Sequence, residues 1–231
     1  MYRNIKVIAF DADDTLWVNE PFFRDAENEF CKLLKNYISK EDCKQLLFEV
    51  EIKNLPLYGY GIKPFTLSLI EAAIALSKNR IPLETVSKII ELGKEMLSKP
   101  IKLIDGIEET LIKLSSKYRL VMATKGDLLD QERKLKKSGL ENYFHHIEVM
   151  SDKQPDNYQK LLQHLDITSN QFLMIGNSLK SDVLPVLEIG AYAIHIPFHI
   201  TWEHEMVTKK VSHHQFKKIA SASELLELFS F

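Results

Sequence analysis

The sequence contains little that would indicate secretion, a membrane or a nucleic-acid partner. It has only two cysteines, Cys31 and Cys43, so a disulfide framework is not expected. The formal net charge is −2, from 30 basic and 32 acidic residues, which gives no support for a nucleic-acid or membrane-surface partner. No apolar run approaches the roughly 20 residues that span a bilayer. Met1–Asn4 is too short for a signal peptide, so we expect a cytoplasmic protein.

Internal repeats and low-complexity segments are also missing, and the composition is that of an ordinary globular protein. Of the 231 residues, 45% are hydrophobic and 27% are charged. This is enough to build one large domain, or a domain with an insert. The composition leaves the oligomeric state open.

Short apolar runs alternate with helical patterns over most of the chain. Such alternation predicts an α/β fold, a Rossmann-like parallel sheet with helices on both faces. The expected strands are Ile5–Phe10, Leu120–Ala123, His146–Met150, Phe172–Ile175 and Ala191–Ile196. The expected helices are Ile107–Lys117, Leu128–Ser138, Tyr158–Leu165, Val183–Glu188 and a final one over Ser221–Phe231.

Residues 18–100 break this alternation, because no convincing strand occurs there. We expect an all-helical insert between the first and second strands, with residues 1–17 and 101–231 forming the core domain. Prolines near the expected helix ends support the boundaries. The expected helices are Glu20–Ile38, Lys40–Lys53, Thr66–Lys78 and Leu83–Leu97, and the segment Leu55–Pro64 is the least regular stretch.

The most informative segment is Phe10–Trp17, which follows the first expected strand. Asp11 and Asp13 are spaced i, i+2, and Thr15 follows. Residues at this spacing in a strand point to the same face, and the carboxyl end of a parallel strand opens into the crevice where α/β proteins bind ligands. Acids gathered there need a cation or hydrogen bonds. The segment therefore suggests a metal-dependent site, although an aspartate that simply caps the next helix would look similar.

Three further polar signals fall at the ends of later strands. Thr124, followed by Gly126, offers a hydroxyl and turn N–H groups to an anion. Lys153 follows the third strand and could place its ammonium against a phosphate or a carboxylate. Asn177 and Asp182 follow the fourth and provide oxygen ligands of the kind that suits Mg²⁺. Each signal alone also fits an ordinary turn, so their joint order carries the argument.

This order of motifs resembles the haloacid dehalogenase superfamily, most of whose members are Mg²⁺-dependent phosphatases. The first motif matches Asp-x-Asp-x-Thr through Asp11, Asp13 and Thr15. The resemblance covers the whole chain, and it implies that residues 18–100 form a type 1 helical cap. It also implies a small phosphorylated metabolite as substrate and an aspartyl-phosphate intermediate.

The resemblance further implies roles for the site residues. Asp11 would be the nucleophile, and Asp13 would act as general acid and then base. The phosphate-binding residues would be Thr124, Lys125 and Lys153, and the Mg²⁺ site would consist of Asp11, Asp13, Asn177 and Asp182. The fourth motif departs from the usual Gly-Asp, because this chain has Gly176-Asn177.

Several alternatives stay open at this level. A phosphomutase shares Asp13 and a type 1 cap, and a non-catalytic binding protein could be built on the same fold. Tyr58, Tyr60 and Lys63 are the candidates for substrate specificity in the insert, although aromatic residues there more often belong to a core. Trp202 or His204 could line the rim of the site. A zinc site around His204 is not expected, since the segment lacks a recognised ligand spacing.

Overall fold

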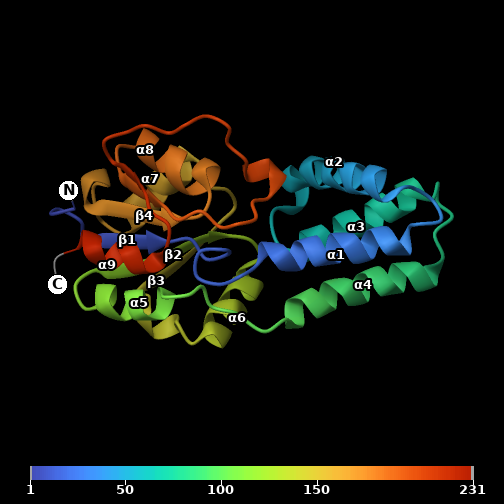
Figure 1. Cartoon of the computed structure of the whole chain (residues 1–231), viewed down its shortest axis with the longest axis horizontal. Helices are drawn as coiled ribbons and strands as arrows, with labels where there is room; N and C mark the ends of the chain where they lie inside the picture. Colours follow the sequence, from blue (N-terminus) through green and yellow to red (C-terminus); the bar gives the residue numbers. More distant parts are fainter. Residues whose placement is uncertain (1, 230–231) are drawn as a thin grey trace. The chain divides into compact units, whose positions relative to one another are not determined.

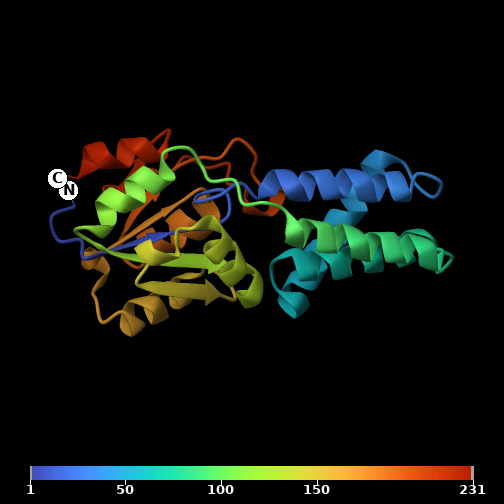
Figure 2. The same cartoon turned by 90° about the horizontal axis from the view of Figure 1, so that it is seen from below.

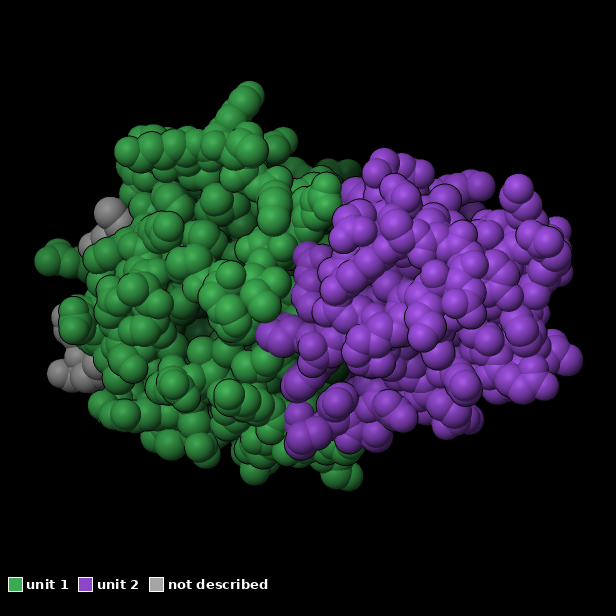
Figure 3. All heavy atoms as spheres, turned by 45° about the vertical axis from the view of Figure 1, so that its right-hand side comes forward, with its two compact units in different colours: residues 1–20, 101–125, 131–231 green, residues 21–100, 126–130 purple. Residues whose placement is uncertain are grey.

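The computed structural model describes residues 2–229 and divides the chain into two compact units. Unit 1 comprises Met1–Glu20, Ile101–Lys125 and Gln131–Phe231, and unit 2 comprises Pro21–Pro100 with Gly126–Asp130 (Figure 3). The division differs from the expected one at two places. Residues 18–20 belong to unit 1, and a short segment after the second strand joins unit 2.

Unit 1 is built on a parallel sheet of six strands in the order β3-β2-β1-β4-β5-β6 (Figure 1). All five expected strands form, and the shortest strand was not expected because its three residues carry two lysines and no apolar run. The strands are β1 Val7–Phe10, β2 Arg119–Lys125, β3 His146–Met150, β4 Phe172–Gly176, β5 Tyr192–His195 and β6 Phe216–Lys218.

The central strand β1 separates two apolar cores, because alternate side chains point to opposite faces. Ile8 and Phe10 pack into one core with residues of α5 (Ile107–Ser115), α6 (Leu128–Ser138) and α9 (Leu225–Leu228). Val7 and Ala9 pack into the other core with residues of α7 (Pro155–His164) and α8 (Leu184–Glu188). The predicted fold class, a parallel sheet covered on both faces, is confirmed.

Two helices of unit 1 differ from expectation. A π-helix over Leu179–Val183 precedes α8, where the sequence pattern indicated a helix from Val183 onward. The C-terminal helix is shorter than expected, since a 3₁₀ turn over Ala222–Glu224 leads into α9. The last two residues of the predicted helix, 230–231, lie outside the described residues.

Residues 21–100 of unit 2 form four helices that lie side by side (Figures 1 and 2). They are α1 Glu20–Leu33, whose first residue belongs to unit 1, α2 Lys40–Tyr58, α3 Ile62–Leu76 and α4 Leu83–Ser98. Their inner faces enclose a separate apolar core. Cys31 and Cys43 belong to this core as buried free thiols. Across residues 2–229, no helix combines the length and apolar character needed to cross a membrane.

The end of α2 corrects the expectation of an irregular segment from Leu55. The helix continues through Pro56 to Tyr58. Contacts with α3 hold this last turn, because the Asn54 amide donates to Ser68 Oγ at 3.1 Å and the Tyr58 hydroxyl donates to Glu71 Oε1 at 2.6 Å. These tertiary hydrogen bonds offset the helix hydrogen bond that a proline removes.

Candidate active site

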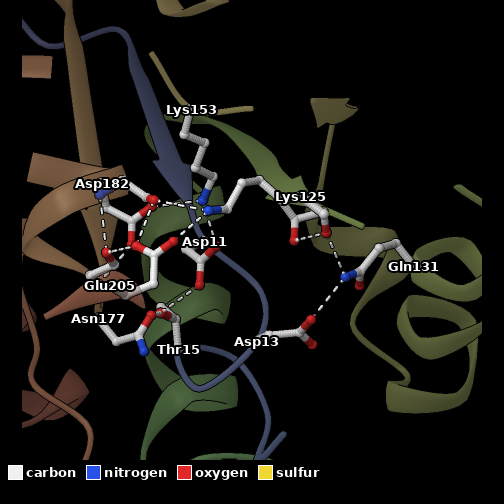
Figure 4. A network of polar contacts seen from close by, with 12 residues as sticks. Asp11, Asp13, Thr15, Lys125, Gln131, Lys153, Asn177, Asp182 and Glu205 are labelled. Atoms are coloured by element: carbon white, nitrogen blue, oxygen red, sulfur yellow. Dashed lines mark hydrogen bonds and ion pairs between the residues drawn. The ribbon is translucent and has the colours of Figure 1, made fainter. Parts of the chain in front are cut away.

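The polar residues singled out at the strand ends gather at the carboxyl edge of the sheet (Figure 4). Asp11 directly follows β1, and its N–H donates to the Ile175 carbonyl of the neighbouring β4 at 2.9 Å. Lys153 follows β3, and Asn177 follows β4. Because parallel strands end at the same edge, residues far apart in sequence meet here.

A buried ammonium between two carboxylates forms the centre of the site. Lys153 Nζ donates to Asp11 Oδ1 at 2.5 Å and to Asp182 Oδ1 at 2.6 Å. The exposed fractions of these residues are 2% for Lys153, 8% for Asp11 and 1% for Asp182. One positive charge thus lies against two negative ones where water has little access, so the three charges depend on one another.

Burial and these neighbours shift the ionisation of both partners. Burial raises the pKa of Asp11 to about 7, with the nearby Lys153 ammonium lowering it and the Asp182 carboxylate adding to the rise. Burial alone would lower the pKa of Lys153, but the two carboxylates raise it well above its ordinary value. Lys153 therefore stays protonated across the physiological range.

Thr15 connects Asp11 to the loop after β4. Its hydroxyl lies 3.1 Å from Asp11 Oδ2 and 3.4 Å from Asn177 Oδ1. A hydrogen bond holds the backbone of Asn177, because His195 Nε2 lies 2.8 Å from the Asn177 carbonyl oxygen. A carbonyl only accepts, so this ring nitrogen carries the proton. The Thr15 hydroxyl thus lies close to both the second oxygen of Asp11 and the amide oxygen of Asn177.

Gly176 allows Asp182 to reach the site. A Cβ atom at position 176 would lie 2.2 Å from Asp182 Oδ2, which is impossible without displacement. The same oxygen accepts the N–H of Ser178 at 3.0 Å. Both oxygens of Asp182 therefore have protein donors, one from Ser178 and one from Lys153.

The oxygen atoms present fit a magnesium ion with few direct protein ligands. Within residues 2–229, no group of three or more His, Cys, Asp or Glu side chains could hold a metal ion. The donor set here is instead mixed, since Asp11 Oδ2 and the amide oxygen of Asn177 both lie near the Thr15 hydroxyl. Mg²⁺ commonly binds through one or two carboxylates and keeps several waters. Because both oxygens of Asp182 are engaged, its expected role is through water.

Asp13 is directed away from Asp11, toward α6 (Figure 4). Its Oδ1 accepts the indole N–H of Trp17 at 2.7 Å and the ammonium of Lys134 at 2.9 Å. Its Oδ2 accepts the side-chain amide of Gln131 at 2.9 Å. The sequence pattern gave no role to Lys134 or Gln131, because a basic helix usually indicates only a solvated face.

The third carboxylate of the first motif, Asp14, has a structural role. Its φ angle is +62°, in the left-handed region. Its side chain accepts the N–H groups of Asn19 and Glu20 at 2.8 to 3.1 Å, and α1 begins at Glu20. Asp14 therefore caps this helix, as aspartate commonly does.

The residues at the end of β2 are already engaged within unit 1. The Thr124 hydroxyl donates to the Lys125 carbonyl at 3.1 Å. Lys125 Nζ donates to Glu205 Oε1 at 2.6 Å and to Ser181 Oγ at 3.0 Å. A role of Thr124 and Lys125 in binding phosphate stays a prediction, and Lys125 would have to share its ammonium with Glu205.

Glu205 is a member of this network that the sequence did not reveal. It lies in the segment considered above only for Trp202 and His204, and it accepts from Lys125, Ser178 and Ser181. Burial would raise its pKa, but the Lys125 ammonium and these hydrogen bonds lower it to about 2. A glutamate in an irregular polar segment gives no periodic signal, and only the return of the chain to the sheet edge identifies it.

The specificity candidates belong to unit 2. Tyr58 ends α2, Tyr60 lies in the following turn, and Lys63 lies in the first turn of α3. Lys63 Nζ pairs with Asp127 Oδ1 of the same unit at 2.8 Å. Their contribution to substrate choice stays a prediction.

Residues 5–190 match the family model described as "haloacid dehalogenase-like hydrolase". The chain belongs to this family. It is similar to the structure of a haloacid dehalogenase-like family hydrolase from Xanthomonas campestris, with 38% identity, a TM-score of 0.88 and coverage of 97% of this chain and 90% of that one. The family assignment, the hydrolase class and the resemblance stated from the motifs are confirmed. No curated protein matches the chain.

More distant structures share the fold but carry the names of different activities. One is a predicted phosphoglycolate phosphatase from Haemophilus somnus 129PT, with 15% identity, a TM-score of 0.65 and 99% of both chains covered. Another is a 2-haloacid dehalogenase from Pseudomonas syringae pv. tomato DC3000, with 20% identity, a TM-score of 0.65 and 97% of both chains covered. The reaction of this haloacid dehalogenase-like hydrolase must therefore be argued from its own residues.

Proposed function

We propose that this haloacid dehalogenase-like hydrolase is a Mg²⁺-dependent phosphatase that cleaves a small phosphomonoester through an aspartyl-phosphate. The observation that carries the proposal is the pair of carboxylates in the first motif, held in different environments. Asp11 lies against the buried Lys153 ammonium, and Asp13 lies apart with its own set of donors. Carboxylates in different environments suit different roles, a nucleophile and a proton carrier.

In the first step, a carboxylate oxygen of Asp11 attacks phosphorus, and the bond from phosphorus to the ester oxygen breaks. The electron pair of that bond goes to the leaving oxygen, which takes a proton from Asp13. The products of this step are an alcohol and the phosphorylated Asp11. In the second step, Asp13 takes a proton from water, whose oxygen attacks phosphorus and releases phosphate and the Asp11 carboxylate.

Electrostatics require positive charge at this centre. A carboxylate that approaches a phosphate dianion at 4 Å is repelled by about 1 kcal/mol per charge pair even at the dielectric constant of water. The Lys153 ammonium opposes this repulsion next to Asp11. Mg²⁺ bound by Asp11, Asn177 and the Asp13 carbonyl, with Asp182 acting through water, would supply further charge stabilisation.

Two other reactions are less well supported. A dehalogenase does not need a proton donor for its halide leaving group, whereas Asp13 is present here and held by several donors. A phosphomutase would use the same residues and return the phosphoryl group to a sugar, so it is the second candidate. A binding protein without activity on this fold is the remaining alternative, and the intact set of Asp11, Asp13 and Lys153 argues against it.

Hydrolysis of a generic aryl phosphate with and without Mg²⁺ tests the proposal. We expect turnover that depends on Mg²⁺ and that Asp11→Asn abolishes. Asp156→Asn, an exposed aspartate in the first turn of α7, is the matched control and should retain activity. Turnover unaffected by Asp11→Asn would contradict the mechanism, and a lack of hydrolysis across a panel of phosphorylated metabolites would favour the binding alternative.

A further inference from the structure

We propose that Lys134, Trp17 and Gln131 are positioning residues that leave Asp13 Oδ2 as the atom that carries the proton. The inference rests on the proposed phosphatase function, because it concerns the acid-base carboxylate of that reaction. It assigns roles to residues of α6 and of the loop after β1, none of which touches Asp11 in the contacts described above.

Asp13 Oδ1 accepts two hydrogen bonds. A carboxylate oxygen has two lone pairs in the plane of the group. Trp17 Nε1 at 2.7 Å and Lys134 Nζ at 2.9 Å both donate to this one oxygen. Charge-assisted hydrogen bonds of this kind are stronger than neutral ones. Oδ1 is therefore saturated and is a poor place for a proton.

The surroundings of Asp13 Oδ2 differ from those of Oδ1. Among the described residues it accepts a single hydrogen bond, from Gln131 Nε2 at 2.9 Å. The same Gln131 nitrogen donates to the Lys125 carbonyl at 2.9 Å. Both neighbours of this nitrogen are acceptors, so they fix which end of the amide faces Asp13. Oδ2 keeps one lone pair, and the proton is transferred there.

The surroundings of Lys134 direct its ammonium toward Asp13. Its side chain is 11% exposed, whereas lysines of a basic helix normally extend into water. A second acceptor, Asn19 Oδ1, lies 2.9 Å from the ammonium and aims it at Asp13. Gln131, one helical turn before Lys134, is 2% exposed. Lys134 and Gln131, on this face of α6, thus contact Asp13 instead of extending into water.

The arrangement predicts which step these residues serve. When the ester bond breaks, a poor leaving group needs the proton from Asp13, and a good one departs without it. Loss of the contacts that position Asp13 should therefore slow only the reaction of substrates with poor leaving groups. The value of kcat/KM reports the steps up to formation of the phosphorylated Asp11, so it isolates this proton transfer.

The experiment compares kcat/KM of Lys134→Met with that of the wild-type protein, on phenyl phosphate and on 2,4-dinitrophenyl phosphate. We expect kcat/KM to fall about 10-fold or more for phenyl phosphate and less than about 2-fold for the dinitrophenyl ester. Lys134→Arg should recover part of the loss because it keeps the charge. Lys137→Met, at an exposed position of the same helix, is the matched control and should change neither value.

Two readouts keep a folding defect apart from a positioning role. The first is the melting temperature of each variant. The second is Gln131→Leu, which removes the hydrogen bond to Asp13 Oδ2 and should lower kcat/KM for phenyl phosphate much more than for the dinitrophenyl ester. An equal loss on both substrates in correctly folded Lys134→Met overturns the inference but leaves the phosphatase proposal intact. Failure of the unchanged protein to hydrolyse either ester would instead contradict both proposals.

Discussion

Asn177 occupies the position at which this family usually has an aspartate, and its surroundings show what the amide still provides. Its Oδ1 lies 3.4 Å from the Thr15 hydroxyl that also contacts Asp11, and its backbone carbonyl contacts His195. A neutral amide oxygen attracts a cation less strongly than a carboxylate does. Asn177 therefore offers an oxygen close to the Thr15 hydroxyl, without the negative charge of an aspartate.

Changing Asn177 should alter magnesium affinity in both directions. We expect Asn177→Ala to raise the Mg²⁺ concentration for half-maximal activity by about 10-fold, and Asn177→Asp to lower it. The rise in melting temperature with added Mg²⁺ provides a second readout, since a ligand that binds the folded state stabilises it. Asn170→Ala, at an exposed turn before β4, serves as the control. Unchanged metal dependence in Asn177→Ala would remove this residue from the site.

Glu205 should make the protein's stability depend on pH at the acid end. Its pKa is about 2 in the folded protein, against 4.5 for an ordinary glutamate. A carboxylate with a lowered folded-state pKa contributes stability above its unfolded pKa and loses it as pH falls. The contribution is at most about 3 kcal/mol and disappears between about pH 4.5 and pH 2.

Urea unfolding between pH 2 and pH 6 measures this contribution. Glu205→Gln should flatten the pH dependence of the unfolding free energy in that window, because the titrating group is gone. Glu203→Gln, at an exposed position two residues earlier, should leave the slope unchanged. If Glu205→Gln keeps the full acid dependence, Glu205 does not hold the charge that the contacts with Lys125 indicate.

The residues that sequence reasoning found and missed differ in how they reach the site. Asp11, Lys153 and Asp182 follow strands, and the rule that parallel strands end at one edge brings them together. Glu205 and Lys125 are 80 residues apart, and Lys134 and Asp13 are 121 apart. Such pairs depend on where one loop and one helix return to the sheet edge, which no local pattern encodes.

At the scale of secondary-structure elements, the end of β4 is the most constrained segment of the site. Gly176 ends the strand, and Asp182, which lies within the π-helix Leu179–Val183, returns over it. π-Helices are rare in proteins and are frequently found at functional sites. The sequence pattern indicated a helix only from Val183 onward, because a helical period does not reveal how the first turn is wound.

Gly176→Ala should damage this segment more than a methyl group usually does. The new Cβ would lie 2.2 Å from Asp182 Oδ2, so either the strand end or the carboxylate must move. We expect a loss of about 1–3 kcal/mol in unfolding free energy and a fall in kcat of at least about 10-fold. Circular dichroism with denaturant and steady-state kinetics measure the two effects. Stability and activity close to those of the unchanged protein would show that the loop relaxes freely.

The ends of other elements reflect the same limit of local patterns. The sequence pattern indicated an irregular segment from Leu55, yet α2 continues through Pro56 to Tyr58 because Asn54 and Tyr58 bond to α3. Strand β6 has one partly buried residue followed by two exposed lysines, so it pairs with β5 without an apolar signal. Both differences come from tertiary contacts, which outweigh intrinsic propensity.

At the scale of the whole molecule, the two units differ in which segments of the sequence form their cores. The core of unit 2 is built from residues between Ala26 and Met96. Unit 1 uses segments on both sides of that stretch, because β1 pairs with β2 on one side and with β4 on the other. The core of unit 2 therefore comes from one continuous stretch of sequence, whereas unit 1 depends on its first strand.

Isolated fragments should show this difference. We expect a fragment of residues 21–100 to be helical and to unfold cooperatively in urea, since it contains a complete apolar core. A fragment of residues 101–231 should lack cooperative unfolding, because it has no strand to fill the centre of the sheet. Circular dichroism and size-exclusion chromatography provide the measurements. Cooperative unfolding of the second fragment would mean that its strands close the sheet without β1.

The central position of β1 also has a consequence for synthesis on the ribosome. The strand Val7–Phe10 emerges first, but its partner β2 begins only at Arg119. At about 5–20 residues per second, several seconds or more separate the two. During that interval an apolar strand with both edges unpaired is exposed while the helical segment folds behind it. Nascent chains paused before β2 are thus the form of this protein most open to aggregation and to binding by chaperones.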